Sequence, residues 1–352
     1  MVLLVAGISA ARCSDSPSQP TDPAAPHIVC PAAPAPFPAT DPLGAVVTYN
    51  PATVANGTPP ISGPTCTPAS GSKFPIGSTT VACTVSDARA RTDACTFTVV
   101  VQAAPTLRVT RFVAFGDSIT AGEIVGEGLV AQGGVMVRPL LVDPFLSYPA
   151  DLTRDLAVRY QAQSPFVTNA GVSGETTTQG AARLPSALSP VNQQPPQVLL
   201  LLEGANDLGS GNPSTVTPAV LNLDAMVRTG KSHGLPVFVG TLPPENPNAC
   251  SGAGVPAGCV FRAGGAPLVV PFNNAVRLMA ASEGVTLVDV YQAFNGNVTT
   301  LIDFDGLHPT AAGYQVIADT YFAAIRQTLE ASAALSPDAF GAPLLLPLPR
   351  RR

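Results

Sequence analysis

The segment Arg111-Phe-Val-Ala-Phe-Gly-Asp-Ser118 joins an almost entirely apolar run to a short polar turn that ends in a serine. Gln197-Val-Leu-Leu-Leu-Leu202 is a second apolar run of the same kind. Both have the composition of strands that are buried on both faces of a parallel sheet. Shorter strand candidates lie at residues 166–168, 237–239 and 285–288, and helical patterns span residues 148–160, 176–188, 216–233, 268–282 and 311–329. This alternation predicts a parallel sheet covered by helices on both faces.

Polar, glycine-rich turns follow the predicted strands. Gly116-Asp-Ser118 comes after the first strand, Asn169-Ala-Gly-Val-Ser-Gly174 after the second and Glu203-Gly-Ala-Asn-Asp207 after the third. Asp303-Phe-Asp-Gly-Leu-His308 comes after the last strand and opens the final helix. Because the carboxyl ends of such strands meet at one edge of the sheet, where ligands bind, we expect these four turns to lie together.

A serine nucleophile needs a base, which near neutral pH is usually an imidazole. The chain has three histidines. His27 precedes a strand-rich segment and His233 ends a predicted helix, whereas His308 lies in one of the polar turns. Asp305, three residues earlier, can reach the imidazole nitrogen that does not face the serine. We therefore predict a catalytic triad of Ser118, His308 and Asp305.

An acyl-transfer site also needs hydrogen-bond donors for the oxyanion that forms during the reaction. The predicted donors are the backbone N–H groups of Ser118 and Gly174 and the side-chain amide of Asn206. Asp117 is expected to cap the turn after the first strand, and Asp303 is a second carboxylate candidate near the histidine.

The four turns together resemble the sequence blocks of the SGNH (GDSL) hydrolase family: Gly116-Asp-Ser118, Gly174, Gly204-Ala-Asn206 and Asp305-Gly-Leu-His308. The resemblance covers about residues 111–330, and residues 169–184 are similar to bacterial multifunctional thioesterase/arylesterases. It implies a flavodoxin-like three-layer α/β/α fold and an esterase or lipase that needs no metal or organic cofactor. It also implies the triad and oxyanion roles given above.

Two segments depart from that resemblance. Residues 123–147 are long and are broken by glycine and proline, and residues 242–266 form an enlarged loop that contains Cys250 and Cys259. Both are expected to border the site. The resemblance therefore implies hydrolysis of a small-molecule carboxylic ester through an acyl-enzyme, without fixing the substrate. Two alternatives stay open, a carbohydrate O-acetylesterase and a surface adhesion protein with a vestigial hydrolase domain.

Residues 25–102 have a different pattern. Ala45-Val-Val-Thr-Tyr49, Thr79-Thr-Val-Ala-Cys-Thr-Val85 and Cys95-Thr-Phe-Thr-Val-Val-Val101 are short β-branched runs between turns, which predicts an Ig-like sandwich. Cys30-Pro31 and Phe74-Pro-Ile-Gly77, with the runs around the later cysteines, resemble the hyalin repeat (HYR) module. Such modules look like adhesion or spacer units, so this domain is expected to contact a cell surface or a polysaccharide.

The chain has seven cysteines, and those of the β-domain are Cys30, Cys66, Cys83 and Cys95. Their even number and the further pair in the enlarged loop favour disulfides and an oxidising compartment. Four cysteines allow three pairings, and the sequence does not choose among them. Zinc is the poorer interpretation, because there is no Cys-x-x-Cys pair and no histidine near the second group.

The first dozen residues are apolar and end before Cys13, as in the core of a signal peptide. Such a segment predicts either a lipid anchor at Cys13 or ordinary signal-peptidase cleavage near Ala10–Ala11, and both imply a secreted or cell-envelope bacterial protein. The net charge of −5, with no basic stripe, argues against a nucleic-acid partner. The predicted organisation is a signal or lipoprotein-like segment (1–24), an HYR-type domain (25–102), a linker (103–110), a hydrolase domain (111–331) and a disordered tail (332–352).

Overall fold

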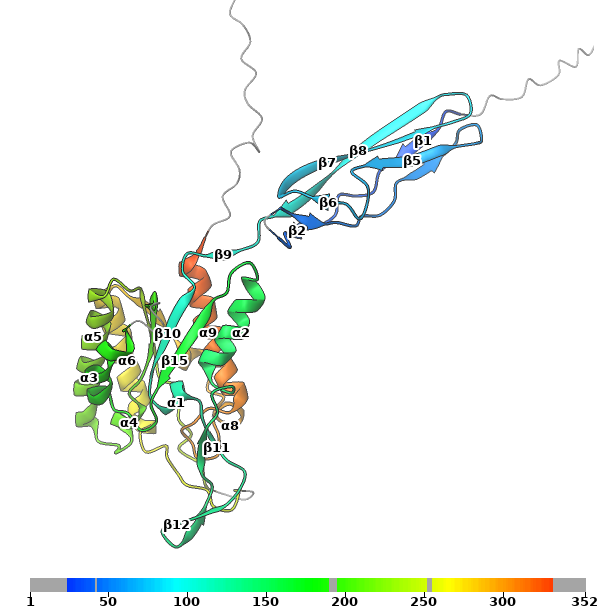
Figure 1. The fold of residues 1–352 in the computed structure, drawn as a ribbon. Coiled ribbons are helices and arrows are strands. Elements are labelled where there is room, and N and C mark those ends of the chain that lie inside the picture. Colours follow the sequence, from blue (N-terminus) through cyan, green and yellow to red (C-terminus); the bar gives the residue numbers. More distant parts are fainter. Residues whose placement is uncertain (1–23, 42, 190–194, 252–254, 332–352) are drawn as a thin grey trace, which may run out of the picture. The chain divides into compact units, whose positions relative to one another are not determined.

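The structure is a computed structural model that describes residues 24–41, 43–189, 195–251 and 255–331. These residues form two compact units, with the break after Ala103 (Figure 1). The domain bounds given above stay a proposal. Cys13 and the predicted tail lie outside the described residues. None of the helices in the described part of the chain is both long and apolar enough to cross a membrane.

The second unit contains a five-stranded sheet in which every neighbouring pair is parallel. Its spatial order is β15 (Phe166–Gly171), β10 (Arg111–Gly116), β16 (Val198–Leu202), β17 (Val237–Gly240) and β18 (Thr286–Val288). This is the order 2-1-3-4-5 of flavodoxin-like sheets, so the expected fold class is confirmed. All residues of β16 are buried, which explains why this strand reads as a continuous apolar run.

Five long helices cover the sheet: α2 (Tyr148–Arg159), α3 (Thr177–Ala187), α5 (Val216–Ser232), α6 (Ala266–Glu283) and α9 (Ala311–Leu329). In Figure 1, α3, α5 and α6 lie on one face, whereas α2 and α9 pack together on the other. The stacked rings of Tyr148 and Tyr321, 5.3 Å apart, join the two helices of that second layer. Each buried aromatic or aliphatic side chain there contributes roughly 1.5–3 kcal/mol by leaving water.

The start and the end of this unit are paired. β9 (Thr106–Leu107), in the segment expected to be a linker, lies antiparallel to β19 (Glu330–Ala331). The Glu330 carboxylate accepts two hydrogen bonds of 2.8 Å from the Arg159 guanidinium and one of 2.7 Å from the Tyr160 hydroxyl. The chain therefore enters the unit at the amino end of β10, next to the last described residue.

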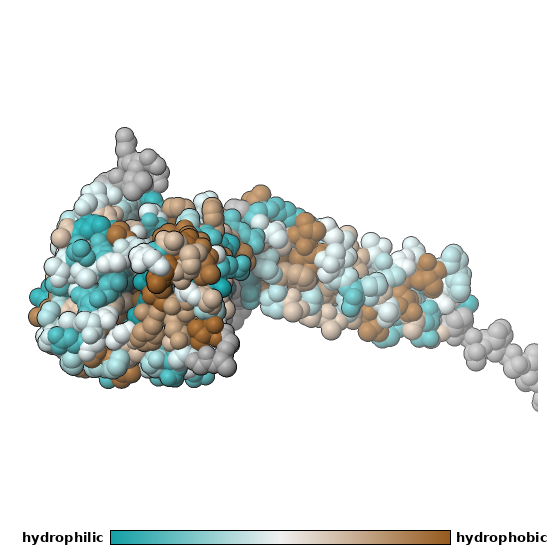
Figure 2. Space-filling view, turned by 90° about the horizontal axis from the view of Figure 1, so that it is seen from below, coloured by the Kyte–Doolittle hydropathy of each residue, from teal (hydrophilic) through white to brown (hydrophobic). Residues whose placement is uncertain are grey.

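A β-ribbon not expected from the sequence occupies most of residues 123–147. β11 (Glu123–Val125) pairs with β14 (Leu140–Val142), and β12 (Val130–Gln132) pairs with β13 (Val135–Val137). The ribbon leaves α1 (Ser118–Ala121) and returns to α2. Large apolar side chains on it are exposed: Leu129, Val130, Val135, Met136, Leu141 and Val142. Figure 2, seen from the end where β12 lies, shows apolar residues gathered on the second unit.

The first unit has a four-stranded sheet, ordered β2 (Phe37–Pro38), β8 (Thr92–Gln102), β7 (Gly77–Ser86) and β5 (Ser62–Thr67). Two ribbons complete it, β1 (His27–Val29) with β4 (Thr53–Ala55) and β3 (Ala45–Val46) with β6 (Lys73–Phe74). The strand expected over residues 45–49 is therefore shorter. Buried and exposed residues alternate along β7, as in a sheet with one face in a core.

This unit contains two disulfides. Cys30 is bonded to Cys95 and Cys66 to Cys83, which selects one of the three pairings that the sequence allowed. Three of these sulfur atoms lie within 4.8 Å of one another, but all belong to disulfides and are not free to bind zinc. The third disulfide, Cys250–Cys259, lies in the enlarged loop of the second unit.

Candidate active site

Ser118 lies at the first position of α1, directly after the carboxyl end of β10. Asp117 caps this helix, because its carboxylate accepts a 3.0 Å hydrogen bond from the Ile119 N–H and a 3.3 Å one from the Ala205 N–H. The predicted capping role of Asp117 is thus confirmed. A side chain at Gly116 would collide with the Leu202 carbonyl, so glycine is needed where the strand turns. These contacts hold the Ser118 hydroxyl at the edge of the sheet.

The structure brings together the three predicted triad residues. His308 Nε2 lies 3.0 Å from Ser118 Oγ, and His308 Nδ1 lies 2.6 Å from Asp305 Oδ2. The other oxygen of Asp305 accepts hydrogen bonds from the backbone N–H groups of Leu307 (2.9 Å) and His308 (3.0 Å). The side chains of Asp305 and His308 are only 2% exposed, so water does not compete for these contacts.

The position of this turn differs in one respect from the expectation. The turn does not follow a strand end: β18 ends at Val288, and α7 (Val290–Ala293) and α8 (Val298–Leu301) come before Asp303. The segment with Asp305 and His308 instead directly precedes α9. The Thr310 hydroxyl caps the start of that helix by accepting a hydrogen bond from the Gly313 N–H. The other histidines lie elsewhere: His27 is 3.1 Å from Asp93 in the first unit, and His233 is an exposed C-cap.

Gly174 and Asn206 line the same cavity as Ser118 and His308. The Asn206 side-chain amide donates one hydrogen bond of 3.0 Å to the Glu175 carbonyl, and an amide carries a second N–H. Asp207 fixes α4 (Ala205–Leu208) by accepting a 2.9 Å hydrogen bond from the Thr177 N–H. Gly174 has φ +76°, a left-handed conformation that favours glycine. Gly174 and Asn206, two of the residues predicted to supply oxyanion donors, therefore lie on the wall of the cavity that Ser118 also lines.

The cavity has a volume of about 600 Å³. Both enlarged segments contribute to it, as expected: Glu123 and Leu140 come from the ribbon, and Phe261, Arg262 and Gly264 come from the disulfide loop. Ser118, Ser173, Ala205, Gly209 and Leu307 complete its lining, together with Gly174, Asn206 and His308. The cavity thus combines the Ser118 hydroxyl and the His308 imidazole with further polar groups and with the apolar side chains of Leu140, Phe261 and Leu307.

The sequence model of the GDSL-like lipase/acylhydrolase family matches residues 114–316, which is more than half of the chain. The chain belongs to this family. It is an enzyme that hydrolyses esters. The model of the HYR domain matches residues 21–101, and HYR domains and disulfides are features of extracellular proteins.

Similar proteins include Esterase TesA from Pseudomonas aeruginosa, which is 26% identical over 167 residues, or 46% of this chain and 71% of that protein. Among solved structures, a lipase/acylhydrolase from Enterococcus faecalis is 23% identical, with a TM-score of 0.46 over 63% of this chain and 97% of that one. Axe2, an acetylxylan esterase from Geobacillus stearothermophilus, is 21% identical, with a TM-score of 0.45 over 61% and 94% of the two chains.

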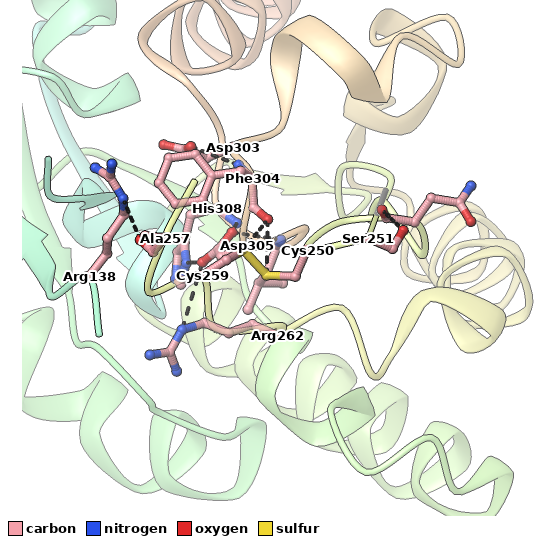
Figure 3. Close-up of a disulfide and its surroundings, with 12 residues drawn as sticks. Arg138, Cys250, Ser251, Ala257, Cys259, Arg262, Asp303, Phe304, Asp305 and His308 are labelled. Carbon is pink, nitrogen blue, oxygen red and sulfur yellow. Dashed lines mark hydrogen bonds and ion pairs between the residues drawn. A yellow bond between two sulfur atoms is a disulfide. The ribbon is translucent and has the colours of Figure 1, made fainter. Parts of the chain in front are cut away.

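The disulfide loop of this GDSL hydrolase lies against the turn that carries Asp305 and His308 (Figure 3). The sulfur atoms of Cys250 and Cys259 lie 3.4 and 3.1 Å from the Phe304 carbonyl oxygen. Arg138 of the ribbon contacts the same region, because its N–H donates a 2.9 Å hydrogen bond to the Gly258 carbonyl and its guanidinium lies 5.2 Å from the Phe304 ring centre. The two enlarged segments are therefore joined by a hydrogen bond beside the site.

Sequence reasoning missed three polar residues of the site, Glu123, Ser173 and Arg262, of which Glu123 lies beside the imidazole. Glu123 Oε2 lies 3.4 Å from His308 Nε2, and its side chain is 12% exposed. Asp303, the second carboxylate considered from the sequence, instead accepts a 2.7 Å hydrogen bond from the Phe304 N–H. The only sequence signal for Glu123 was an acidic residue at the start of the enlarged segment, with no spacing motif to connect it with His308.

The charged forms of His308, Asp305 and Glu123 stabilise one another. Burial lowers the pKa of His308, but the hydrogen bond with Asp305 and then the contact with Glu123 raise it more, so the net shift is upward. Burial raises the pKa of Asp305, but its hydrogen bond with His308 lowers it more. The same opposition lowers the pKa of Glu123. The imidazolium form of His308 therefore lies between two ionised carboxylates.

Proposed function

We propose that this esterase works through an acyl-enzyme formed on Ser118, with His308 as the general base and Asp305 as its partner. The observation that carries the proposal is the continuous contact from Ser118 Oγ to His308 Nε2, at 3.0 Å, and from His308 Nδ1 to Asp305, at 2.6 Å. Asp305 holds the imidazole in the tautomer whose Nε2 lone pair faces the serine, and it stabilises the imidazolium that forms.

In the first step, Ser118 Oγ attacks the ester carbonyl while its proton moves to His308 Nε2. The tetrahedral intermediate then collapses, and His308 gives this proton to the oxygen of the leaving alcohol. In the second step, His308 takes a proton from water while the water oxygen attacks the acyl carbon. The bond between the acyl carbon and Ser118 Oγ then breaks, and His308 gives the proton back to Oγ. The products are the free acid and the alcohol.

The oxyanion of both tetrahedral intermediates is proposed to accept hydrogen bonds from the backbone N–H groups of Ser118 and Gly174 and from the Asn206 amide. These groups are supported as donors by their positions in one cavity and by the hydrogen bond that orients Asn206. Donors that are already in place stabilise the developing charge without reorganisation.

Ser118→Ala tests the proposal. Hydrolysis of p-nitrophenyl acetate should be lost while the thermal unfolding midpoint stays close to that of the wild type. Ser232→Ala, at an exposed position at the end of α5, is the matched control and should retain full activity. Full activity of the Ser118 variant would refute the nucleophile. Labelling of the wild type by a fluorophosphonate, lost in Ser118→Ala, would exclude a vestigial hydrolase domain.

Carbohydrate O-acetyl esters are the second candidate substrates. Beside the triad, the cavity is lined by Glu123, Ser173 and Arg262, which can accept from and donate to the hydroxyl groups of a sugar. Leu140 and Phe261 line the same cavity and suit an apolar acyl chain instead. Acetate release from acetylated xylan, compared with hydrolysis of p-nitrophenyl esters of increasing acyl length, separates the two classes.

Export and surface attachment are also proposed. They are supported by the HYR domain and the disulfides together with the apolar N-terminal segment that ends before Cys13. If Cys13 carries a lipid, Cys13→Ser releases the protein from the membrane fraction of an expressing bacterium. Contact of the HYR domain with a cell surface or a polysaccharide can be measured by pull-down on insoluble polysaccharides.

A further inference from the structure

Glu123 is held in place by its backbone. It follows Gly122, whose φ of +91° ends α1, and a side chain at Gly122 would collide with Ser147 and with the Asp143 carbonyl. Its own carbonyl accepts a 2.6 Å hydrogen bond from the Tyr314 hydroxyl, and β11 pairs it with Val142. The turn after α1 and the ribbon therefore fix the backbone from which the Glu123 side chain enters the cavity.

Two oxygen atoms approach the same nitrogen of His308. Ser118 Oγ lies 3.0 Å and Glu123 Oε2 lies 3.4 Å from Nε2. When the imidazole is neutral, with its proton on the nitrogen beside Asp305, Nε2 presents a lone pair, which an ionised carboxylate repels. When the imidazole is protonated, Nε2 carries an N–H, which both oxygens attract. An ionised Glu123 therefore favours the imidazolium over the neutral imidazole.

We propose that Glu123 is a second carboxylate of the active site, which binds the His308 imidazolium at the nitrogen that faces Ser118 and thereby sets the pH range of the esterase. This inference rests on the proposed function. The other titratable groups that face the imidazole or Glu123 are Asp117 before α1, Asp303 and Asp305 in the turn before α9, Arg262 in the disulfide loop and Tyr314 in α9.

Among these groups, Glu123 and Asp305 raise the pKa of His308 by hydrogen bonding, and Arg262 helps to keep Glu123 ionised. Asp305 contacts Nδ1, whereas Glu123 contacts the nitrogen that takes the proton from Ser118. The two carboxylates therefore act on opposite sides of one ring. Glu123 keeps its charge throughout the reaction, and the proton moves only between Ser118, His308 and the leaving oxygen.

Glu123 then has opposite effects at low and at high pH. In the free enzyme below the pKa of His308, the imidazole is already protonated and cannot accept the proton of Ser118. Above that pKa, Glu123 stabilises the positive charge that forms on His308 as the serine attacks, so turnover is faster. A carboxylate in this place moves the active range to higher pH and raises the rate within it.

Glu123→Gln keeps the shape of the side chain and removes its charge. In the pH profile of kcat/KM for p-nitrophenyl acetate, we expect the acidic limb to move down by about one pH unit or more, as for the loss of an adjacent opposite charge. The plateau at high pH should fall several-fold, so the two profiles cross. Glu127→Gln, an exposed residue of the same ribbon, removes an equal charge and should leave the acidic limb unchanged.

A second measurement does not depend on turnover. The imidazole signals of only three histidines can be followed by NMR in the full chain, and His27 and His233 are exposed. His308 should titrate at lower pH in Glu123→Gln than in the wild type. An unmoved His308 titration, or an unmoved acidic limb in an active variant, would overturn the inference even if Ser118→Ala is inactive. Full activity of Ser118→Ala would instead refute the proposed function, whatever Glu123 does.

Discussion

Asn246 donates its backbone N–H to the carbonyl oxygen of Gly306 at 2.8 Å, so the disulfide loop is bonded to the turn that lies between Asp305 and His308. The N–H of Arg262 donates a second hydrogen bond of 2.8 Å to the Asp305 carbonyl. A side chain at Gly306, where φ is +88°, would collide with the Asn246 carbonyl, so the two segments are in close contact. The loop therefore helps to position the carboxylate partner of His308.

Replacing both Cys250 and Cys259 by serine should lower kcat/KM several-fold, because the loop that holds Asp305 then gains freedom. A disulfide that closes a loop of this length stabilises the folded state by about 2–3 kcal/mol, because it lowers the entropy of the unfolded chain. Its removal should therefore also lower the thermal unfolding midpoint of the hydrolase unit. Steady-state kinetics and calorimetry measure the two effects. The same change at Cys66 and Cys83, in the other unit, should leave kcat/KM unaltered, and wild-type kinetics in the Cys250/Cys259 variant would show that the loop does not position the site.

Asn206→Ala should reduce kcat on the order of 100-fold with a small change in KM, because an oxyanion donor acts mainly in the transition state. Steady-state kinetics with p-nitrophenyl acetate measures the loss. Asn222→Ala is a suitable control, since the Asn222 amide donates hydrogen bonds to the Thr177 and Thr178 hydroxyls of α3 but Asn222 is not among the residues that line the cavity. A loss confined to KM would mean that Asn206 binds the substrate and not the oxyanion.

Asp305→Asn should lower kcat by roughly 10⁴-fold, because the amide cannot hold the imidazole in the required tautomer or stabilise its charge. Asp303→Asn is the matched control two residues away, since the Asp303 carboxylate accepts the Phe304 N–H rather than an imidazole hydrogen. We expect the control to keep most of its activity in the same assay. Similar losses in both variants would argue that the turn has simply been disturbed.

Glu203 should make the stability of the hydrolase unit fall with rising pH. Both of its carboxyl oxygens are buried without a hydrogen-bond partner among the residues that the structure describes, and burial first, then the charge of Asp117, raises its pKa from 4.5 to about 9. Between these values the folded form keeps a proton that the unfolded form releases. The free energy of unfolding therefore falls from pH 4.5 upward, by at most about 1.4 kcal/mol per pH unit from this group.

Glu203→Gln removes the titrating carboxyl and with it this contribution to the pH dependence of the free energy of unfolding. Urea unfolding of the wild type and the variant at pH 5.5 and pH 8 should show a smaller loss of stability in the variant, which gains most at the higher pH. Parallel stability curves for the two proteins would mean that Glu203 is ionised, or solvated, in the folded state.

The sheet could be predicted closely because buried parallel strands are apolar along their whole length. β10 and β16 were found within one residue, and α9 was found with both ends, since Thr310 caps a clear helical pattern. The rule for the carboxyl ends of parallel strands placed Ser118, Gly174 and Asn206 at one edge of the sheet, whereas Asp305 and His308 join them from the turn before α9 and not from a strand end. These features depend on local composition and on one general rule of topology.

Features that depend on distant contacts could not be predicted. The ribbon of residues 123–142 contains several glycines, and its strands are only three residues long, so no strand pattern stands out in the sequence. Glu123 and His308 are 185 positions apart, and no spacing connects them. Cys83 and Cys95 lie opposite each other on β7 and β8, yet each is bonded to a cysteine of another segment. That choice depends on where β5 and the residue after β1 lie.

The pairing of Thr106–Leu107 with Glu330–Ala331 has a practical consequence. Both ends of the hydrolase unit meet at the amino end of β10, whereas Ser118 lies past the carboxyl end of the same strand. A resin or a carrier protein coupled at either end would hold the enzyme at the opposite end of β10 from Ser118. Neighbouring ends also suit insertion of the whole unit into a surface loop of another protein, or circular permutation, because a short connection can join them.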